Sequence, residues 1–118
     1  MAGRHLEGEV RPTQAGAVLD LRGEINGFAQ EALDAAYEET EAINPEAILL
    51  NFEEVDYINS TGIALIVGVL AKVRASKRRL LTYGLSEHYR NIFQITRLDD
   101  AIGIYDSEES AVRAADSL

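Results

Sequence analysis

The chain has 118 residues, of which 47% are hydrophobic and 26% are charged, so it is expected to form one globular domain rather than a disordered chain. It contains no cysteine, which excludes disulfide frameworks, thiolate metal sites and cysteine nucleophiles. Twenty acidic residues against 11 basic residues give a net charge of −9, which disfavours nucleic acids and anionic membranes as partners.

Two short strands and one helix are expected before residue 45. Residues 17–21 predict a strand between Gly16 and Gly23, and residues 6–11 predict a weaker strand that pairs with it as an edge hairpin. From Phe28 the apolar residues recur at helical spacing, which predicts a helix that ends at Asn44-Pro45. The expected buried face of this helix consists of Phe28, Ala32, Ala35, Ala36 and Ile43, flanked by Leu33 and Tyr37.

Strands alternate with helices from residue 47 onward. Residues 47–52 are a continuous apolar run, typical of a buried parallel strand, and residues 80–83 and 102–105 predict two further strands. Helices are expected over residues 60–76 and 87–96, and Ser107 is a favoured N-cap for a last helix that continues through Arg113. This order predicts a single α/β domain with a mainly parallel central sheet, an N-terminal antiparallel edge and about four helices.

No segment approaches the roughly 20 apolar residues that a membrane span requires, since the longest run covers residues 63–71 and contains Gly68. We therefore expect a soluble cytoplasmic protein without a membrane span. Five cations fall within eight positions at the end of the helix predicted over residues 60–76: Lys72, Arg74, Lys77, Arg78 and Arg79. They complement the carbonyl end of the helix and lack interleaved aromatic residues, which favours a solvated helix end over a nucleic-acid site.

The segment from Asp56 to Ile63 carries the most functional information. A strand is expected to end near Phe52 and to be followed by a short acidic connector, after which a helix begins at Ser60. The carboxyl edge of a parallel sheet is where α/β proteins usually place ligands and functional groups. The Ser60 hydroxyl would lie beside unpaired backbone N–H groups, where a phosphate is stabilised. The alternative is that Ser60 simply caps the helix, because serine is a favoured N-cap.

The helix that begins at Ser60 is apolar on two sides. One stripe is expected to face the sheet, namely Ile63, Ile66, Val67, Leu70 and Val73. The opposite side is also apolar or small, through Ala64, Leu65, Gly68 and Val69. Gly68 costs about 1 kcal/mol relative to alanine in a helix interior. The second side therefore offers a surface to a partner or is covered by core packing, and the sequence leaves both open.

Catalytic chemistry is not indicated. A hydrolase that used Ser60 with His88 and an aspartate would need an oxyanion hole and a pocket, and the sequence predicts neither. With two histidines and no cysteine, we expect no metal site, no cofactor and no catalytic residue.

Three motifs in chain order resemble those of STAS domains, and most closely those of stand-alone bacterial anti-sigma factor antagonists. Leu21-Arg22-Gly23-Glu24-Ile25-Asn26 is similar to the first signature of the family, Leu-x-Gly-Glu-Leu-Asp, and residues 48–52 are similar to its central strand. Asn59-Ser60-Thr61-Gly62-Ile63 is similar to the hallmark Asp-Ser-Ser/Thr-Gly-Leu, whose first serine is the phosphorylation site. The likeness continues through residues 80–85 and 93–98, so one STAS domain is expected to span residues 1–118.

The resemblance implies a partner switch. In this family the unphosphorylated antagonist binds an anti-sigma factor with a histidine-kinase-like ATP fold and so frees the sigma factor. The anti-sigma factor is a serine kinase that phosphorylates the antagonist and breaks the complex, and a serine phosphatase resets it. Carried over, the phosphorylated residue is Ser60, with Thr61 as the alternative. The expected partner-binding residues are Asn26, Asn59, Ser60, Thr61, Gly62, Ala64, Leu65 and Gly68, where Gly62 would admit close approach of the partner or its nucleotide.

Two positions depart from the family pattern, because Asn59 and Asn26 stand where aspartate is usual. If those aspartates position the serine hydroxyl, phosphorylation is slowed here. If they only add negative potential, their loss eases the approach of ATP. A scaffold without phosphorylation, in a stress-signalling or transport assembly, and a nucleotide-binding STAS module are the alternatives, and the oligomeric state is left open.

Overall fold

Five strands form one sheet in the order β1-β2-β3-β4-β5 in the computed structural model, which describes residues 5–14 and 16–117. Strand β1 (Glu7–Thr13) is antiparallel to β2 (Gly16–Ile25). The remaining neighbours, β3 (Ala47–Ile58), β4 (Arg79–Tyr83) and β5 (Gly103–Tyr105), are parallel to one another and β3 is parallel to β2. The predicted mainly parallel sheet with an antiparallel edge is confirmed.

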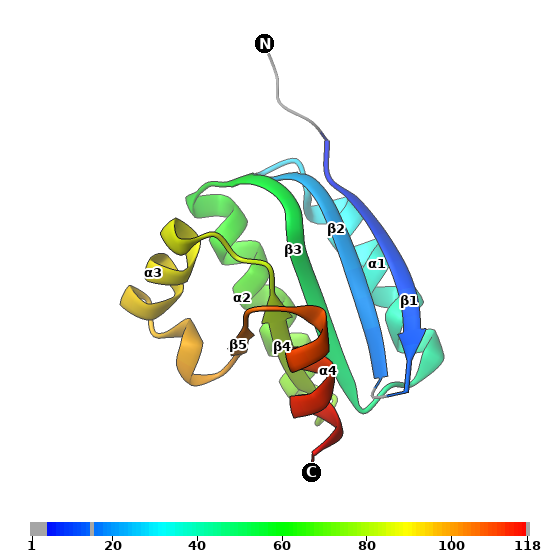
Figure 1. The fold of residues 1–118 in the computed structure, drawn as a ribbon. Helices are drawn as coiled ribbons and strands as arrows, with labels where there is room; N and C mark the ends of the chain where they lie inside the picture. The colour runs from blue at the N-terminus through cyan, green and yellow to red at the C-terminus, as the bar shows by residue number, and fades with distance from the viewer. Residues whose placement is uncertain (1–4, 15, 118) are drawn as a thin grey trace.

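Helices cover both faces of the sheet (Figure 1). Helices α1 (Gln30–Ile43) and α2 (Ser60–Ala75) lie behind it in this view, and α4 (Glu108–Asp116) lies in front. Helix α3 (Glu87–Ile95) is followed by a short 3-10 helix, η1 (Leu98–Asp100), which the sequence pattern did not indicate. The larger core lies on the α1 and α2 side, and a smaller one forms under α4. None of the helices in the described residues is long and apolar enough to cross a membrane.

Strand β3 continues to Ile58, so the prediction that it ends near Phe52 before an acidic connector is wrong. Its second half pairs with the end of β2, with Glu54 opposite Arg22 and Ile58 opposite Ile25. The pairing shifts register beside Gly23, whose φ of 110° lies in the left-handed region that favours glycine. The longer strands bring Ile25 and Ile58 together at the edge where α2 begins.

Helix α1 begins at Gln30, two residues later than predicted, and its buried face is rotated from the predicted one. The buried residues are Leu33, Ala36, Tyr37 and Thr40. Phe28 is 88% exposed, and Ala35 and Ile43 are also exposed, so their placement in the core is wrong. Alanines carry little directional signal, and burying the larger Leu33 and Tyr37 sets the rotation of the helix.

Three cations at or just after the end of α2 hold other elements in place. Lys72 pairs with Asp34 of α1 at 2.9 Å. The Arg78 guanidinium, 13% exposed, donates to the Pro45 carbonyl at 2.7 Å, and Arg79 donates to the Ala115 carbonyl of α4. These side chains are therefore bound by the protein, whereas the sequence analysis placed them in a solvated helix end.

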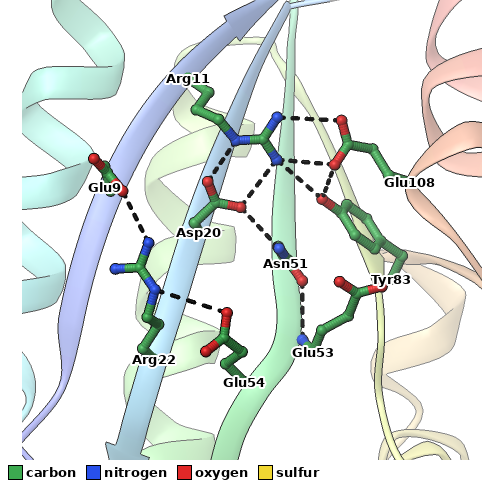
Figure 2. A network of polar contacts seen from close by, with 9 residues as sticks. All are labelled: Glu9, Arg11, Asp20, Arg22, Asn51, Glu53, Glu54, Tyr83 and Glu108. Carbon is green, nitrogen blue, oxygen red and sulfur yellow. Dashed lines mark hydrogen bonds and ion pairs between the residues drawn. The ribbon is translucent and has the colours of Figure 1, made fainter.

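A polar network crosses the α4 side of the sheet and joins four strands to the helix (Figure 2). Arg11 donates to Asp20 at 3.0 Å and to Glu108 at 2.8 Å. Asn51 donates to the Asp20 carboxylate and Tyr83 donates to the Glu108 carboxylate, each at 2.7 Å. The hydrogen bonds from Arg11 hold the pKa of Asp20 and of Glu108 below their usual range, and the Tyr83 hydroxyl adds to the effect on Glu108.

Candidate functional site

Helix α2 begins at the carboxyl edge of the sheet (Figure 1), so Asn59, Ser60, Thr61 and Gly62 lie at this edge, while Ala64, Leu65 and Gly68 follow along the helix. The Asn59 N–H donates to the Ile25 carbonyl at 3.2 Å, which ties the start of α2 to the end of β2. The loop that follows β2 lies beside the first turn of α2, because a Cβ added to Gly27 would be 3.6 Å from Thr61 Cγ2. The structure thus brings the loop at Asn26 next to the hallmark segment.

Asn59 is the N-cap of α2. Its Oδ1 accepts the Gly62 N–H at 2.8 Å and its backbone carbonyl accepts the Ile63 N–H at 2.9 Å. Ser60 is therefore the first residue of the helix and is exposed, and within residues 5–14 and 16–117 its hydroxyl has no hydrogen-bond partner. The alternative that Ser60 caps the helix is wrong. Asparagine and serine are equally favoured caps, so the run Asn59-Ser60 alone did not decide between them.

Replacing Asn59 by alanine is expected to lower the free energy of unfolding by about 1 kcal/mol, because the Gly62 N–H loses its acceptor. Asn59→Asp keeps an acceptor and adds a charge that favours a helix N-terminus, so this variant should be at least as stable as the wild type. Urea unfolding at pH 7 measures both variants. An alanine variant with wild-type stability would contradict the capping role.

Asn26 shapes the loop between β2 and α1. Its Oδ1 accepts the Phe28 N–H at 2.9 Å, and its amide donates to Glu24 at 3.3 Å. Its backbone carbonyl accepts the Ala29 N–H at 3.0 Å. Asn59 and Asn26 therefore both use their side-chain oxygens to hold backbone N–H groups, Asn59 in a helix cap and Asn26 in a turn.

Gly62 is buried, and its missing side chain is required by the protein itself. A Cβ at this position would lie 1.9 Å from the Ile25 carbonyl oxygen and 3.0 Å from Ile58 Cγ2. The space left by the missing side chain of Gly62 is filled by the protein's own β2 strand, so the glycine does not itself explain the expected close approach of a partner or its nucleotide. This glycine sets how closely the first turn of α2 packs on the sheet.

The outward face of α2 carries no charged residue from Ser60 to Ala71. We call this face the α2 strip, which consists of Ser60, Ala64, Val67, Gly68 and Ala71, all exposed. Val67 was expected to face the sheet but is 43% exposed, and Val69 was expected to point outward but is buried. A Cβ on Gly68 would meet nothing within 4 Å, so core packing does not explain this glycine. The predicted Ala64 and Gly68 thus lie on the surface, and Leu65 is half-buried at its side.

A shallow groove runs between the α2 strip and helix α1. It has a volume of about 230 Å³, and Leu33 of α1 and Leu65 of α2 are among the residues that line it. The ion pair between Lys72 and Asp34 belongs to the same lining. The surface beside Ser60 therefore consists mainly of small and apolar side chains and contains few charged ones.

The surroundings of His88 bear on the hydrolase alternative. His88 is exposed on α3 and makes an edge contact with the Tyr89 ring at 4.9 Å, and the Tyr89 hydroxyl accepts the Ile58 N–H at 2.9 Å. Within the part of the chain that the structure describes, no hydrogen bond joins His88 to Ser60. The same residues contain no group of three or more His, Cys, Asp or Glu side chains that could hold a metal ion.

Comparison with known proteins gives consistent matches. A family model described as the STAS domain matches residues 9–111. The anti-sigma-B factor antagonist of Listeria monocytogenes serovar 1/2a is 30% identical over 88 residues, which are 75% of this chain and 77% of the relative.

Two solved structures share the fold. An anti-sigma factor antagonist from Mycobacterium paratuberculosis has a TM-score of 0.79 at 20% identity and covers 93% of both chains. The Bacillus cell fate determinant SpoIIAA in its phosphorylated form has a TM-score of 0.67 at 24% identity, over 91% of this chain and 98% of that one.

Proposed function

The chain belongs to the STAS domain family, and from this premise we propose that it is an anti-sigma factor antagonist switched by phosphorylation of Ser60. In its unphosphorylated form it binds an anti-sigma factor serine kinase and so frees the sigma factor. Phosphorylation breaks the complex, and a serine phosphatase restores the binding form. The relative named as an anti-sigma-B factor antagonist supports the first part of this proposal.

One observation supports the choice of Ser60 above the others. Because Asn59 caps α2, the Ser60 hydroxyl is left exposed and without a hydrogen-bond partner among the described residues. The N–H groups of Ser60 and Thr61 lie in the first turn and have no intrahelical acceptor. A phosphate on Ser60 can accept from them and gains from the positive end of the helix, so the modified protein stays folded.

The effect of the phosphate then falls on the docked partner. A phosphoserine adds a charge of about −2 and three hydrated oxygens. Ser60 is the first residue of the uncharged α2 strip. A partner that covers this surface must therefore remove water from the doubly charged phosphate, which costs binding free energy. Thr61 is a weaker candidate, because its methyl group lies against the loop at Gly27.

Replacing Ser60 by aspartate is expected to weaken binding to the anti-sigma factor of the same cells by about tenfold or more, because a charge enters the docking surface. Ser60→Ala should bind within about twofold of the wild type and should accept no phosphate at this position. Isothermal titration calorimetry gives the affinities, and mass spectrometry after incubation with ATP and the anti-sigma factor maps the phosphate. Thr61→Ala is the matched control and should keep both binding and phosphorylation.

Three outcomes would contradict parts of the proposal. A Ser60→Asp variant that binds the anti-sigma factor as tightly as the wild type would show that a charge at this position does not switch binding. Phosphate on Thr61 in the wild type moves the switch by one residue. Binding without phosphorylation under any condition replaces the switch with a constitutive scaffold.

A further inference from the structure

The most exposed large apolar side chain in the described residues is Phe28, in the loop between β2 and α1. At 88% exposure its ring packs on nothing substantial within the domain. A hydrophobic residue just before a helix often packs on the residue four positions into it, here Leu33, but Leu33 is buried in the core while Phe28 stands free. The stability of the domain therefore does not explain a phenylalanine at this position.

The backbone that carries Phe28 is held in one conformation. The Phe28 N–H donates to Asn26 Oδ1 at 2.9 Å, and the next N–H, of Ala29, donates to the Asn26 carbonyl at 3.0 Å. Glu24 accepts from the Asn26 amide at 3.3 Å and keeps the side chain oriented. An aromatic ring displayed on a fixed turn loses little entropy when it binds, which is typical of an interface anchor.

The loop that carries Phe28 lies beside the start of the α2 strip. Gly27, the neighbour of Phe28, is beside Thr61, so this loop lies next to the end of the α2 strip that begins at Ser60. Gln30, two residues later, lines the groove between α1 and α2 together with Ala64. The loop, the groove and the strip thus form one continuous surface.

Charge indicates what can cover this surface. Glu24 and Glu31 lie on either side of Phe28 in the sequence, within a stretch from Gly23 to Ala71 that contains ten acidic residues and no lysine or arginine. Asp34 in the groove is paired with Lys72 of α2, so the acidic character lies at the loop rather than in the groove. A second copy of the chain would bring like charges together, which costs affinity, whereas a partner with lysine and arginine side chains is attracted. The chemistry of the surface therefore fits a basic protein with an apolar pocket large enough for an aromatic ring.

We propose that Phe28 is the aromatic anchor of the partner-binding surface and enters an apolar pocket that is rimmed by lysine and arginine side chains of the partner protein. The identification of that partner as an anti-sigma factor rests on the proposed function, whereas the chemistry of the pocket rests on Phe28 and the acidic surroundings. The acidic surroundings speed the encounter, and the ring keeps the complex together.

The test begins with site-specific photo-crosslinking in the native cells. The photoreactive amino acid p-benzoylphenylalanine replaces Phe28, Ala64 or Ile95, one at a time, in the full chain. Ile95 is the control, because it is an equally prominent apolar residue, 80% exposed, but lies on a different helix, α3. Positions 28 and 64 are expected to crosslink to the same protein, and position 95 is not.

The captured protein is then purified and its affinity is measured. Phe28→Ala is expected to weaken binding by about 30-fold or more, as for an interface hot spot, while Phe28→Tyr stays close to the wild type and Ile95→Ala has no effect. The association rate should fall as salt rises from about 50 to 300 mM. Thermal unfolding of Phe28→Ala should match the wild type, because the ring is exposed.

The outcomes separate this inference from the proposed function. Crosslinking from position 64 without position 28, or wild-type affinity of Phe28→Ala, overturns the anchor and leaves the antagonist proposal standing. A captured protein that is not an anti-sigma factor but requires Phe28 supports the anchor and overturns the antagonist proposal. Crosslinks between two copies of the chain overturn the basic partner, and no crosslink from either position overturns both proposals.

Discussion

Gly62→Ala is expected to lower the free energy of unfolding by about 3 kcal/mol, because the added methyl group would lie 1.9 Å from the Ile25 carbonyl oxygen. That oxygen belongs to the backbone at the end of β2, so no rotation of a flexible side chain relieves the contact. The first turn of α2 must move away from the sheet, which also displaces Asn59 from its bond to Ile25. Urea unfolding measures the change.

Gly68→Ala in the same helix is the matched control. A Cβ at Gly68 meets nothing within 4 Å, and alanine is favoured over glycine in a helix interior. This variant should therefore be more stable than the wild type by about 0.5–1 kcal/mol. Equal effects of the two substitutions would contradict the packing assigned to Gly62. If the α2 strip is a docking surface, Gly68→Ala should also weaken partner binding while it raises stability.

Asp20→Asn is expected to lower the free energy of unfolding by about 2 kcal/mol at pH 7, because Arg11 and Asn51 both lose a charged acceptor. The Asp20 side chain is 12% exposed, whereas Arg11 is 42% exposed, so solvent reduces the effect below that of a buried ion pair. Arg11 also holds Glu108, so the substitution should loosen α4 from the sheet (Figure 2).

The same substitution should change the pH dependence of stability. The folded pKa of Asp20 and of Glu108 lies below the ordinary values of 3.8 and 4.5, so the unfolded chain binds more protons in acid. Their contribution is full at neutral pH and is lost as the pH falls below about 4. The stability difference between wild type and Asp20→Asn should therefore shrink between pH 6 and pH 3.

An exposed pair provides the control for the pH experiment. Asp100 lies 3.6 Å from Arg97 and both side chains are mostly exposed, so Asp100→Asn should leave stability nearly unchanged at either pH. A difference for Asp20→Asn that stays constant from pH 6 to pH 3 would rule out a charged Asp20 as the stabilising group.

The order of the elements follows from local patterns. The apolar runs at residues 47–52 and 80–83 predicted buried parallel strands, and both are confirmed. Ser107 caps α4 through a reciprocal bond with Ser110, as its place before the helix indicated. The segment from Asn59 to Ile63 was correctly assigned to the start of a helix, because two favoured N-cap residues stand directly before an apolar helical run.

The ends and faces of the elements depended on partners distant in sequence. Residues 54–58 include charged side chains, so the sequence pattern did not predict a strand there. The strand forms because these residues pair with β2. Phe28 looked like a core residue at helical spacing, and only the burial of Leu33 and Tyr37 turned it outward.

The free hydroxyl of Ser60 and the network around Arg11 were also beyond local reasoning. The Ser60 hydroxyl is free because Asn59 is the N-cap of α2. Asparagine and serine are equally favoured at an N-cap, so residue type alone could not tell which of the two occupies it. Arg11 meets Glu108 although 97 positions separate them. By itself the sequence determined which segments form strands and helices, since those preferences act over a few residues. The tertiary structure decided which side chains are buried, free or paired. Packing brings together segments that are far apart in the sequence, and a local pattern contains no information about such contacts.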